Sequence, residues 1–302
     1  MSNASLPGSS HSRPIAAQPF ASAGRIARCF RELAERGELG LVAYLTAGDP
    51  TLEASEKIIL AAVAAGADVI ELGVPFSDPV ADGPTIQRAS ERALQSGTTL
   101  AGVLDLARRL RAGTDVPLVL FSYFNPILQM GLEKLAQTAA RSGIDGVLAT
   151  DLTPEESLDY RQILRAQGLD TIFLGAPTST DARLTQIAEC SSGFIYLISR
   201  TGVTGTRDSL PEELPNLVRR VRRFTKLPVA VGFGISLPDH VSALGGIADA
   251  AVVGSALVAE VEKAVKVSTG GPESAAAAVA RRIRLLKEAA RHGISRRGSN
   301  GD

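Results

Sequence analysis

The chain has 302 residues, of which 45% are hydrophobic, so it can bury one large core; a single α/β barrel commonly uses about 250 residues. Lysine plus arginine and aspartate plus glutamate balance at 32 each, and this balance gives no sign of a nucleic-acid or membrane partner. The two cysteines, Cys29 and Cys190, form no CxxC pair, which disfavours a disulfide framework or a zinc site and favours a reducing cytoplasm.

The two ends of the chain are expected to lie outside the folded domain. Residues 1–24 are rich in Ser, Ala and Pro and contain no acidic residue, and a disordered tail is favoured there over a transit peptide. No apolar run is long enough to cross a bilayer, because Asp68 and Glu71 interrupt the most hydrophobic stretch. We expect a catalytic domain at 25–292 and a second disordered tail at 293–302.

Short runs rich in β-branched residues alternate with longer amphipathic stretches. This alternation predicts parallel strands connected by helices. Helical patterns cover residues 132–142, 211–224 and 273–291 among others. Eight strands are predicted, at residues 41–45, 68–72, 117–121, 146–149, 171–174, 194–198, 228–231 and 250–253.

The order of these elements favours a (β/α)8 TIM barrel with an extra N-terminal helix and with helices inserted in the loops that follow the strands. The longest gap, between the second and third strands, holds an ordered loop at 73–83 and an extra helix at 85–95. A doubly wound open sheet is the alternative, but such sheets usually have a Gly-rich phosphate loop after the first strand, where this chain has TAGDP. Thr153 and Glu156 resemble a capping box, which predicts a helix just after the fourth strand.

The second predicted strand carries an acidic side chain near its end. In barrel enzymes the active site forms at the C-terminal ends of the strands. Alternation along the strand turns Val69 and Glu71 into the barrel, while Ile70 and Leu72 face the helices. A carboxyl group at the top of an apolar barrel is costly to ionise, so its pKa should rise toward the range of general acid–base catalysis. Pairing of Glu71 with an arginine is the structural alternative.

A second candidate carboxylate, Asp82, lies in a loop that is rich in Pro, Gly, Asp and Ser. It directly precedes Gly83, Pro84 and a predicted helix. Three interpretations of Asp82 are therefore open: a catalytic group, a turn hydrogen bond of the kind that Asp78 could also make, or a helix N-cap.

Glycine-rich loops follow the last three predicted strands. They are GVTG at 202–205, GFG at 232–234, and a Gly-Ser pair at which a short helix is expected to begin. Glycines let backbone N–H groups approach an anion, and the helix adds its positive end. Barrels often bind phosphate at the loops after strands seven and eight, although single glycines there would mean only tight turns. The predicted phosphate-binding residues are Gly205, Gly234, Gly254 and Ser255.

No histidine or lysine stands at the C-terminal end of a predicted strand. His11, His240 and His292 lie in the tail, at a helix start and near the C-terminus, which disfavours histidine catalysis and a histidine-ligated metal. Lys226 comes nearest to a strand but at its N-terminal end, which disfavours a Schiff-base aldolase. Carboxylate acid–base chemistry on a small phosphate ester, with no metal, is the chemistry that these residues favour.

Four motifs in the chain resemble those of the tryptophan synthase alpha chain family, and the likeness runs from about residue 25 to 291. The long motif from Glu71 to Gln87 is highly specific, whereas several phosphate-binding barrels share the glycine segments. The chain departs from the family pattern at ATDLT, residues 149–153, where the family usually shows a proline before the aspartate and after the leucine. The motifs are LTAGDP at 45–50, ELGVPFSDP through DGPTIQ at 71–87, SRTGVTG at 199–205 and VGFGIS at 231–236.

This resemblance implies retro-aldol cleavage of indole-3-glycerol phosphate to indole and glyceraldehyde 3-phosphate, in L-tryptophan biosynthesis. Glu71 matches the family's acid/base, which moves protons between the glycerol hydroxyl and indole C3. Asp82 matches the carboxylate that accepts a hydrogen bond from the indole N–H. Tyr196 matches a tyrosine near the scissile bond, and Tyr123 and Asn125 match active-site or partner-facing positions; the tyrosines could also simply fill the barrel interior.

The resemblance also implies a lid, a phosphate site and a partner. Arg200 and Thr204 match residues of a loop that closes over the substrate, and the four predicted phosphate-binding residues match the family's phosphate site. The alpha chain is expected to need no cofactor and to dock, in the cytoplasm, on a pyridoxal-phosphate beta chain as an α2β2 tetramer. Open alternatives are another phosphate-barrel enzyme, a stand-alone lyase that releases indole, and a non-catalytic regulatory subunit, which would need neither Glu71 nor Asp82.

Overall fold

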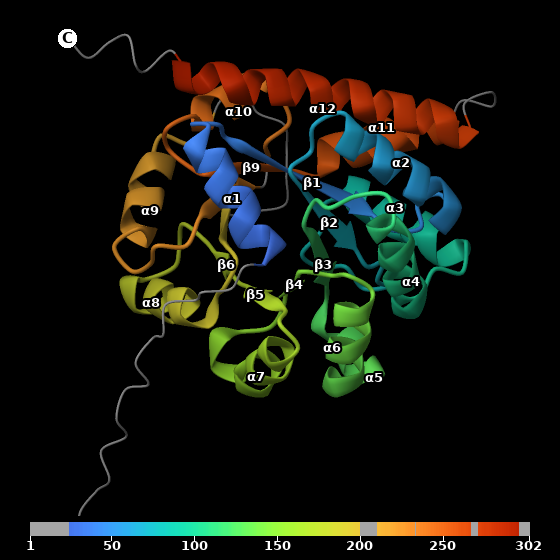
Figure 1. Cartoon of the computed structure of the whole chain (residues 1–302), viewed down its shortest axis with the longest axis horizontal. Coiled ribbons are helices and arrows are strands. Elements are labelled where there is room, and N and C mark those ends of the chain that lie inside the picture. Colours follow the sequence, from blue (N-terminus) through green and yellow to red (C-terminus); the bar gives the residue numbers. More distant parts are fainter. Residues whose placement is uncertain (1–23, 200–209, 233, 267–270, 296–302) are drawn as a thin grey trace, which may run out of the picture.

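A computed structural model describes residues 24–199, 210–232, 234–266 and 271–295. Within them a sheet of parallel strands curls into a barrel with helices around it (Figure 1), in the order β5-β4-β3-β2-β1-β9-β8-β7-β6. The predicted TIM barrel is thereby confirmed and the open doubly wound sheet excluded. The strands are β1 Gly40–Thr46, β2 Val69–Gly73, β3 Leu118–Ser122, β4 Gly146–Ala149, β5 Asp170–Ile172, β6 Leu174–Gly175, β7 Ile195–Ile198, β8 Val229–Gly232 and β9 Ala250–Val253.

The fifth predicted strand, residues 171–174, forms two short strands on either side of Phe173. β5 pairs with β4, and β6 pairs with β7. The segment therefore passes from one neighbour to the other and joins the two ends of the sheet. Side chains keep alternating through the break, since Ile172 belongs to the interior cluster and Phe173 to the outer one.

Helices follow the strands, and the extra helices that the sequence predicted are present: α1 precedes β1, and α3 and α5 are inserted after β2 and β3. The predicted helix at 211–224 is shorter, and the helix after β4 begins with the 3-10 turn η1 before α7. The helices are α1 Arg25–Glu35, α2 Leu52–Ala64, α3 Pro84–Gln95, α4 Leu100–Arg111, α5 Phe124–Met130, α6 Leu132–Arg141, η1 Pro154–Glu156, α7 Leu158–Ala166, α8 Asp181–Cys190, α9 Leu214–Val221, α10 Pro238–Leu244, α11 Ser255–Lys266 and α12 Gly271–Ser295.

The capping box predicted after β4 is wrong in its bonding. Thr153 is the N-cap of η1, but its side chain makes no bond to a backbone N–H. Its hydroxyl instead donates to Glu156 Oε2 over 3.0 Å. A proline at the first position together with this side-chain pair supports only a single turn, and the α-helix starts at Leu158.

Two apolar layers hold the barrel together. The outward-facing strand residues, Ile70 and Leu72 among them, pack with the helices in one cluster. The inward-facing residues, Val69 among them, form a second cluster inside the barrel. The predicted alternation along β2 is therefore confirmed. Burial of both strand faces explains why the strands read as continuous hydrophobic runs.

Helix α1 closes the N-terminal end of the barrel. Its residues Ile26 and Phe30 belong to the interior cluster, and the Phe30 ring lies 5.6 Å from that of Phe194 on the approach to β7. In Figure 1 α1 lies over the ring of strands. With this end plugged, the interior is accessible from the C-terminal ends of the strands, which is the end where barrel enzymes place their sites.

Helix α12 packs along α2, α10 and α11 (Figure 1). It is tied to the sheet by Lys287, whose side chain is 7% exposed and whose Nζ lies 2.7 Å from Asp68 Oδ2 at the start of β2. The same Asp68 oxygen accepts from the backbone N–H of Leu41 over 2.7 Å. The division of the chain into a domain at 25–292 and two flanking tails stays a prediction.

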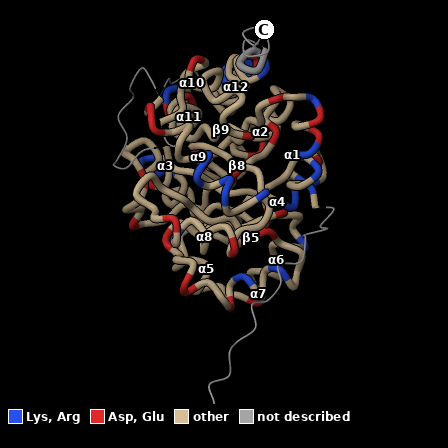
Figure 2. The backbone as a smooth tube through the Cα atoms, turned by 90° about the vertical axis from the view of Figure 1, so that its left-hand side faces the viewer, with Lys and Arg blue, Asp and Glu red and all other residues tan. Residues whose placement is uncertain are grey.

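Acidic and basic residues are interspersed along the backbone in Figure 2, in keeping with their equal totals of 32. Across the described ranges, no helix is both long and apolar enough to cross a membrane. Nor do the described side chains include a group of three His, Cys, Asp or Glu residues placed to hold a metal ion.

Candidate active site

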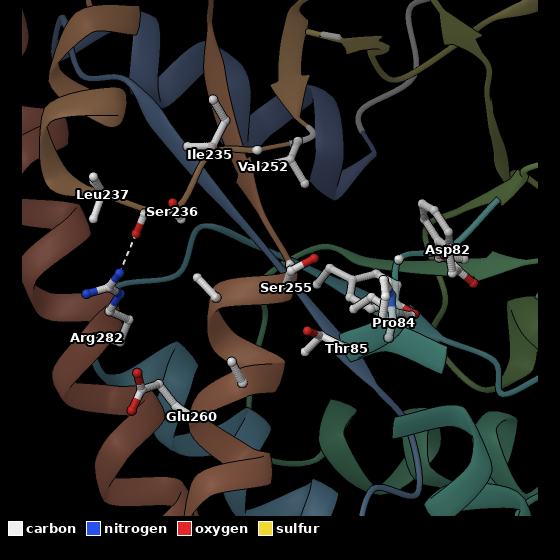
Figure 3. A pocket seen from close by; sticks show the side chains of 18 of the residues that line it. Asp82, Pro84, Thr85, Ile235, Ser236, Leu237, Val252, Ser255, Glu260 and Arg282 are labelled. Atoms are coloured by element: carbon white, nitrogen blue, oxygen red, sulfur yellow. Dashed lines mark hydrogen bonds between the residues drawn. The ribbon is translucent and has the colours of Figure 1, made fainter. Parts of the chain in front are cut away.

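A cavity of about 530 Å³ opens at the C-terminal end of the barrel. Its wall includes Asp82 in the loop after β2, Tyr196 on β7, and Ser255 at the start of α11. In Figure 3, Ser255 lies between Asp82 on one side and Ser236 with Arg282 on the other. One elongated cavity therefore joins the predicted carboxylate to the predicted phosphate site.

Glu71 lies inside the barrel, paired in register with the cavity residue Tyr44 of β1, and is not itself among the residues that line this cavity. Its side chain is fully buried, and among the described residues neither carboxyl oxygen has a hydrogen-bond partner. Burial alone raises the pKa of Glu71 from 4.5 to about 8. The structural alternative, a Glu71–arginine ion pair, finds no support among the described residues. A carboxyl group with this pKa holds its proton at neutral pH and is ready both to give it and to take it back.

Asp82 is oriented by a hydrogen bond from Tyr123. The Tyr123 hydroxyl donates to Asp82 Oδ2 over 3.2 Å and accepts from the backbone N–H of Ala81 over 2.9 Å. Gly83 is the N-cap of α3, and it makes no side-chain cap bond, so the N-cap interpretation of Asp82 is wrong. Burial raises the pKa of Asp82 to about 6, against the Tyr123 hydrogen bond, which lowers it.

Tyr123 therefore contacts Asp82 rather than the cavity. Its ring also stacks on Phe76, with centroids 4.9 Å apart, so the loop after β2 packs on the loop after β3. Asn125, in the same loop region, is exposed on α5.

Three aromatic side chains of the barrel interior, Tyr44, Phe121 and Tyr196, form part of the cavity wall. The Tyr44 ring meets Phe121 edge-on at 5.1 Å, and Phe121 lies 6.5 Å from Tyr196. Burial first, and then the charges of Glu71 and Asp82, raise the pKa of the Tyr196 hydroxyl. The same two carboxylates also raise the pKa of the Tyr44 hydroxyl, and Tyr44 is paired with Glu71 in the register of β1 and β2.

Two glycines make room for these tyrosines. A Cβ atom on Gly73 would come within 2.3 Å of the Tyr44 hydroxyl, and one on Gly232 within 2.2 Å of the Tyr196 hydroxyl. No side chain other than hydrogen fits at either strand end while the tyrosines keep these positions.

The predicted phosphate-binding residues lie at the other end of the cavity. Gly234, Gly254 and Ser255 line it, and Gly234 has a left-handed φ of +83° with open space around it. α11 begins at Ser255 as predicted, but it is a helix of 12 residues rather than a short one. The positive end of this helix suits an anion. Gly205, Arg200 and Thr204 lie outside the described residues.

The backbone of Ser236 borders the cavity next to the predicted phosphate-binding residues. Its N–H donates to Nδ1 of the buried His240 over 3.3 Å, and its carbonyl accepts from Arg282 of α12 (Figure 3). His240, which the sequence placed at a helix start, thus has a structural contact in the loop after β8.

Part of the cavity wall was not predicted from the sequence. Tyr44 and Phe121 were not singled out, although each stands on an inward-facing strand position like Glu71. The signal for them was the strand alternation itself. The contribution of Arg282 and Ser236 had no local signal, because it depends on the packing of α12 against α10.

Comparisons with known proteins agree with this geometry. The family model described as tryptophan synthase alpha chain matches residues 30–291. A tryptophan synthase alpha chain from Solibacter usitatus is 54% identical over 239 residues, which are 79% of this chain and 90% of that relative.

Solved structures give the same result. One of Mycobacterium tuberculosis tryptophan synthase is 34% identical with a TM-score of 0.81, covering 89% of this chain and 99% of the other. That of the tryptophan synthase alpha chain from Legionella pneumophila is 34% identical with a TM-score of 0.80, covering 91% and 99%. The chain therefore belongs to the tryptophan synthase alpha chain family, lyases that cleave indole-3-glycerol phosphate in tryptophan biosynthesis.

Proposed function

We propose that Glu71 is the general acid–base of the cleavage and that Asp82 is its partner on the indole side. The observation that carries this proposal is the fully buried Glu71 carboxyl group, which has no hydrogen-bond partner among the described residues and a pKa of about 8. The charges of Glu71 and Asp82 both raise the pKa of Tyr196, which lines the cavity. The Glu71 carboxyl group, protonated at neutral pH, gives its proton to indole C3, and the carboxylate that this leaves takes the proton of the glycerol hydroxyl as the carbon–carbon bond breaks.

Asp82 accepts the indole N–H and stabilises the positive charge that develops on the ring. Its Oδ2 is oriented by Tyr123, which leaves Oδ1 for the substrate. Protonated at C3, the ring withdraws electrons from the breaking carbon–carbon bond. The aromatic wall of Tyr44, Phe121 and Tyr196 offers edges and faces against which a flat indole ring packs.

The phosphate of the substrate binds at Gly234, Gly254 and Ser255, together with Gly205, where backbone N–H groups and the start of α11 favour an anion. Arg200 and Thr204 belong to the loop that closes over the substrate. Closure excludes water and retains indole.

The chain acts in the cytoplasm with a beta chain, as an α2β2 tetramer in which pyridoxal phosphate belongs to the beta chain and none to this one. Support for the partnership comes from the family membership alone. A stand-alone lyase that releases indole is the second candidate.

The test is direct. The purified chain is mixed with indole-3-glycerol phosphate, with and without a beta chain, and indole is measured. Cleavage that the beta chain accelerates supports the proposal; rapid release without it supports the stand-alone lyase. No product in either case, or full turnover by Glu71→Gln, overturns the role given to Glu71.

A further inference from the structure

An ion-pair network behind the cavity joins the two helices that carry its opposite ends. α3 begins two residues after Asp82, and α11 begins at the phosphate-site residue Ser255. Arg92 of α3 and Glu262 of α11 are the central members of the network. None of its members lines the cavity.

The first half of the network ties α3 to the loop after β1. Arg92 donates from Nε to Asp49 Oδ1 and from Nη2 to Asp49 Oδ2, both over 2.8 Å. Asp49 is 3% exposed and Arg92 is 22% exposed at the side chain. Two parallel bonds of this kind fix the angle of the guanidinium as well as its distance, which a single ion pair does not.

The second half ties α3 to α11. Arg88, one helical turn before Arg92, donates to both oxygens of Glu262, over 2.7 and 2.8 Å. Arg92 Nη1 lies 3.6 Å from Glu262 Oε1, and the Glu262 side chain is 9% exposed. Lys266 approaches the same oxygen at 3.0 Å.

The two helices also meet directly in front of the network. Ile86 and Ala89 of α3 and Val258 of α11 belong to the apolar cluster inside the barrel. These apolar contacts have no directional preference, whereas the bidentate Arg88–Glu262 pair, with Arg92 Nη1 3.6 Å from the same carboxylate, favours one orientation of the two helices. The network therefore sets the rotation of α3 relative to α11.

We propose that Arg92 and Glu262 are positioning residues that fix the separation between the indole end and the phosphate end of the site. This inference rests on the proposed function. A substrate that must reach both ends at once depends on that separation, and a displacement of about 1 Å at a reacting group can cost on the order of a hundredfold in rate. A ligand that occupies one end does not depend on it.

The experiment compares linked and separate ligands. Arg92→Met and Glu262→Gln each remove part of the network, and Arg92→Lys keeps the charge but loses the double hydrogen bond. Arg109→Met is the control, because Arg109 also joins two helices, α4 and α2, through Glu56 over 2.7 Å; its side chain is 30% exposed against 22% for Arg92, and it does not line the cavity. For each variant, dissociation constants are measured for indole, for glycerol 3-phosphate, and for indole-3-propyl phosphate, which links the two and lacks the hydroxyl that retro-aldol cleavage requires.

We expect affinity for the linked ligand and kcat/KM to fall by about 10- to 100-fold in Arg92→Met and Glu262→Gln, with both fragments bound within about twofold of the wild type. The losses in Arg92→Lys are expected to be intermediate between those of the wild type and of Arg92→Met. Arg109→Met should lower the melting temperature without separating linked from single ligands.

Equal losses for fragments and linked ligand, or unchanged kinetics with lower stability, would overturn the positioning role. If wild-type protein does not cleave indole-3-glycerol phosphate at all, the proposed function fails first. A wild type that is active, with variants that treat linked and separate ligands alike, removes the inference while leaving the proposed function intact.

Discussion

The hydroxyl of Tyr123 donates a 3.2 Å hydrogen bond to Oδ2 of Asp82, 41 residues earlier in the chain. This bond joins the loops after β2 and β3. It favours the ionised form of Asp82 and so opposes the rise in pKa that burial causes. Tyr123 thus acts on the site through Asp82, without lining the cavity itself.

Replacing Tyr123 by phenylalanine is expected to raise the pKa of Asp82 further, because the bond that lowers it is lost. If ionised Asp82 accepts the indole N–H, activity appears as pH rises through this pKa. The acidic limb of the kcat/KM profile should therefore move to higher pH in Tyr123→Phe, with a loss of about tenfold at pH 6 and less at pH 8. An unshifted acidic limb would show that Tyr123 does not influence the ionisation of Asp82 on which activity depends.

Asp82→Asn keeps the size of the side chain and removes its charge. We expect kcat to fall by about a hundredfold, a typical effect for a group that stabilises charge in the transition state. Asp78→Asn is the control, since Asp78 is exposed in the same loop and accepts a hydrogen bond from Ser77. Equal kinetics in the two variants would return Asp82 to the role of a turn residue.

Glu71→Gln tests the buried acid through stability. The folded-state pKa of about 8 lies above the ordinary 4.5, so the wild type loses stability as pH rises from about 4.5 to 8, because over this range Glu71 ionises in the unfolded chain but stays protonated in the folded one. Glutamine has no charge to bury. The melting temperature of Glu71→Gln relative to wild type should therefore climb between pH 5 and pH 8 and level off above that. Glu91→Gln, at an exposed position on α3, should show no such trend. A difference that stays flat with pH would mean that Glu71 is not buried as described.

Gly73→Ala should disturb the aromatic wall. The new Cβ would come within 2.3 Å of the Tyr44 hydroxyl, so the ring has to move, and the open space next to it is the cavity. We expect KM to rise by about tenfold, which corresponds to roughly 1.4 kcal/mol. Gly102→Ala in α4 is the control, where the new Cβ meets only the Leu52 side chain at 3.0 Å and the Thr99 hydroxyl at 3.6 Å. Normal substrate affinity in Gly73→Ala would show that the Tyr44 ring has room elsewhere.

Lys287→Met removes one partner of a buried ion pair. Asp68 then keeps its bond from Leu41 N–H but loses its cation, and such a change costs about 3 kcal/mol or more of unfolding free energy. Lys57→Met breaks the exposed Lys57–Glu273 pair and should cost at most about 1 kcal/mol. Urea denaturation measures both. Similar losses in the two variants would contradict the importance of burial for the α12 attachment.

The sequence predicted the barrel well because strand alternation and helix periodicity are local. The inward direction of Glu71 follows from the alternation of side chains along β2. The same alternation along β1 and β3 turns Tyr44 and Phe121 into the barrel. The division of the fifth strand at Phe173 had no local signal, since it reflects a change of neighbour when the ring closes.

Contacts between segments far apart in the chain could not be predicted from the sequence. The Tyr123–Asp82 bond spans two loops, and Arg92 reaches Asp49 across 43 positions. Nothing near either residue distinguishes these partners from other polar residues of the same type. The Thr153–Glu156 motif shows the opposite error, because a correct local pattern was satisfied by a side-chain pair and a single 3-10 turn.

The complete enclosure of Glu71 has a consequence for turnover. In the proposed role the carboxyl group gains one proton and returns one, so every cycle leaves it as it began. A carboxyl group without access to solvent must end each cycle in its starting protonation state, because no water or buffer molecule reaches it to supply or remove a proton. The rate of cleavage should then be independent of buffer concentration at fixed pH.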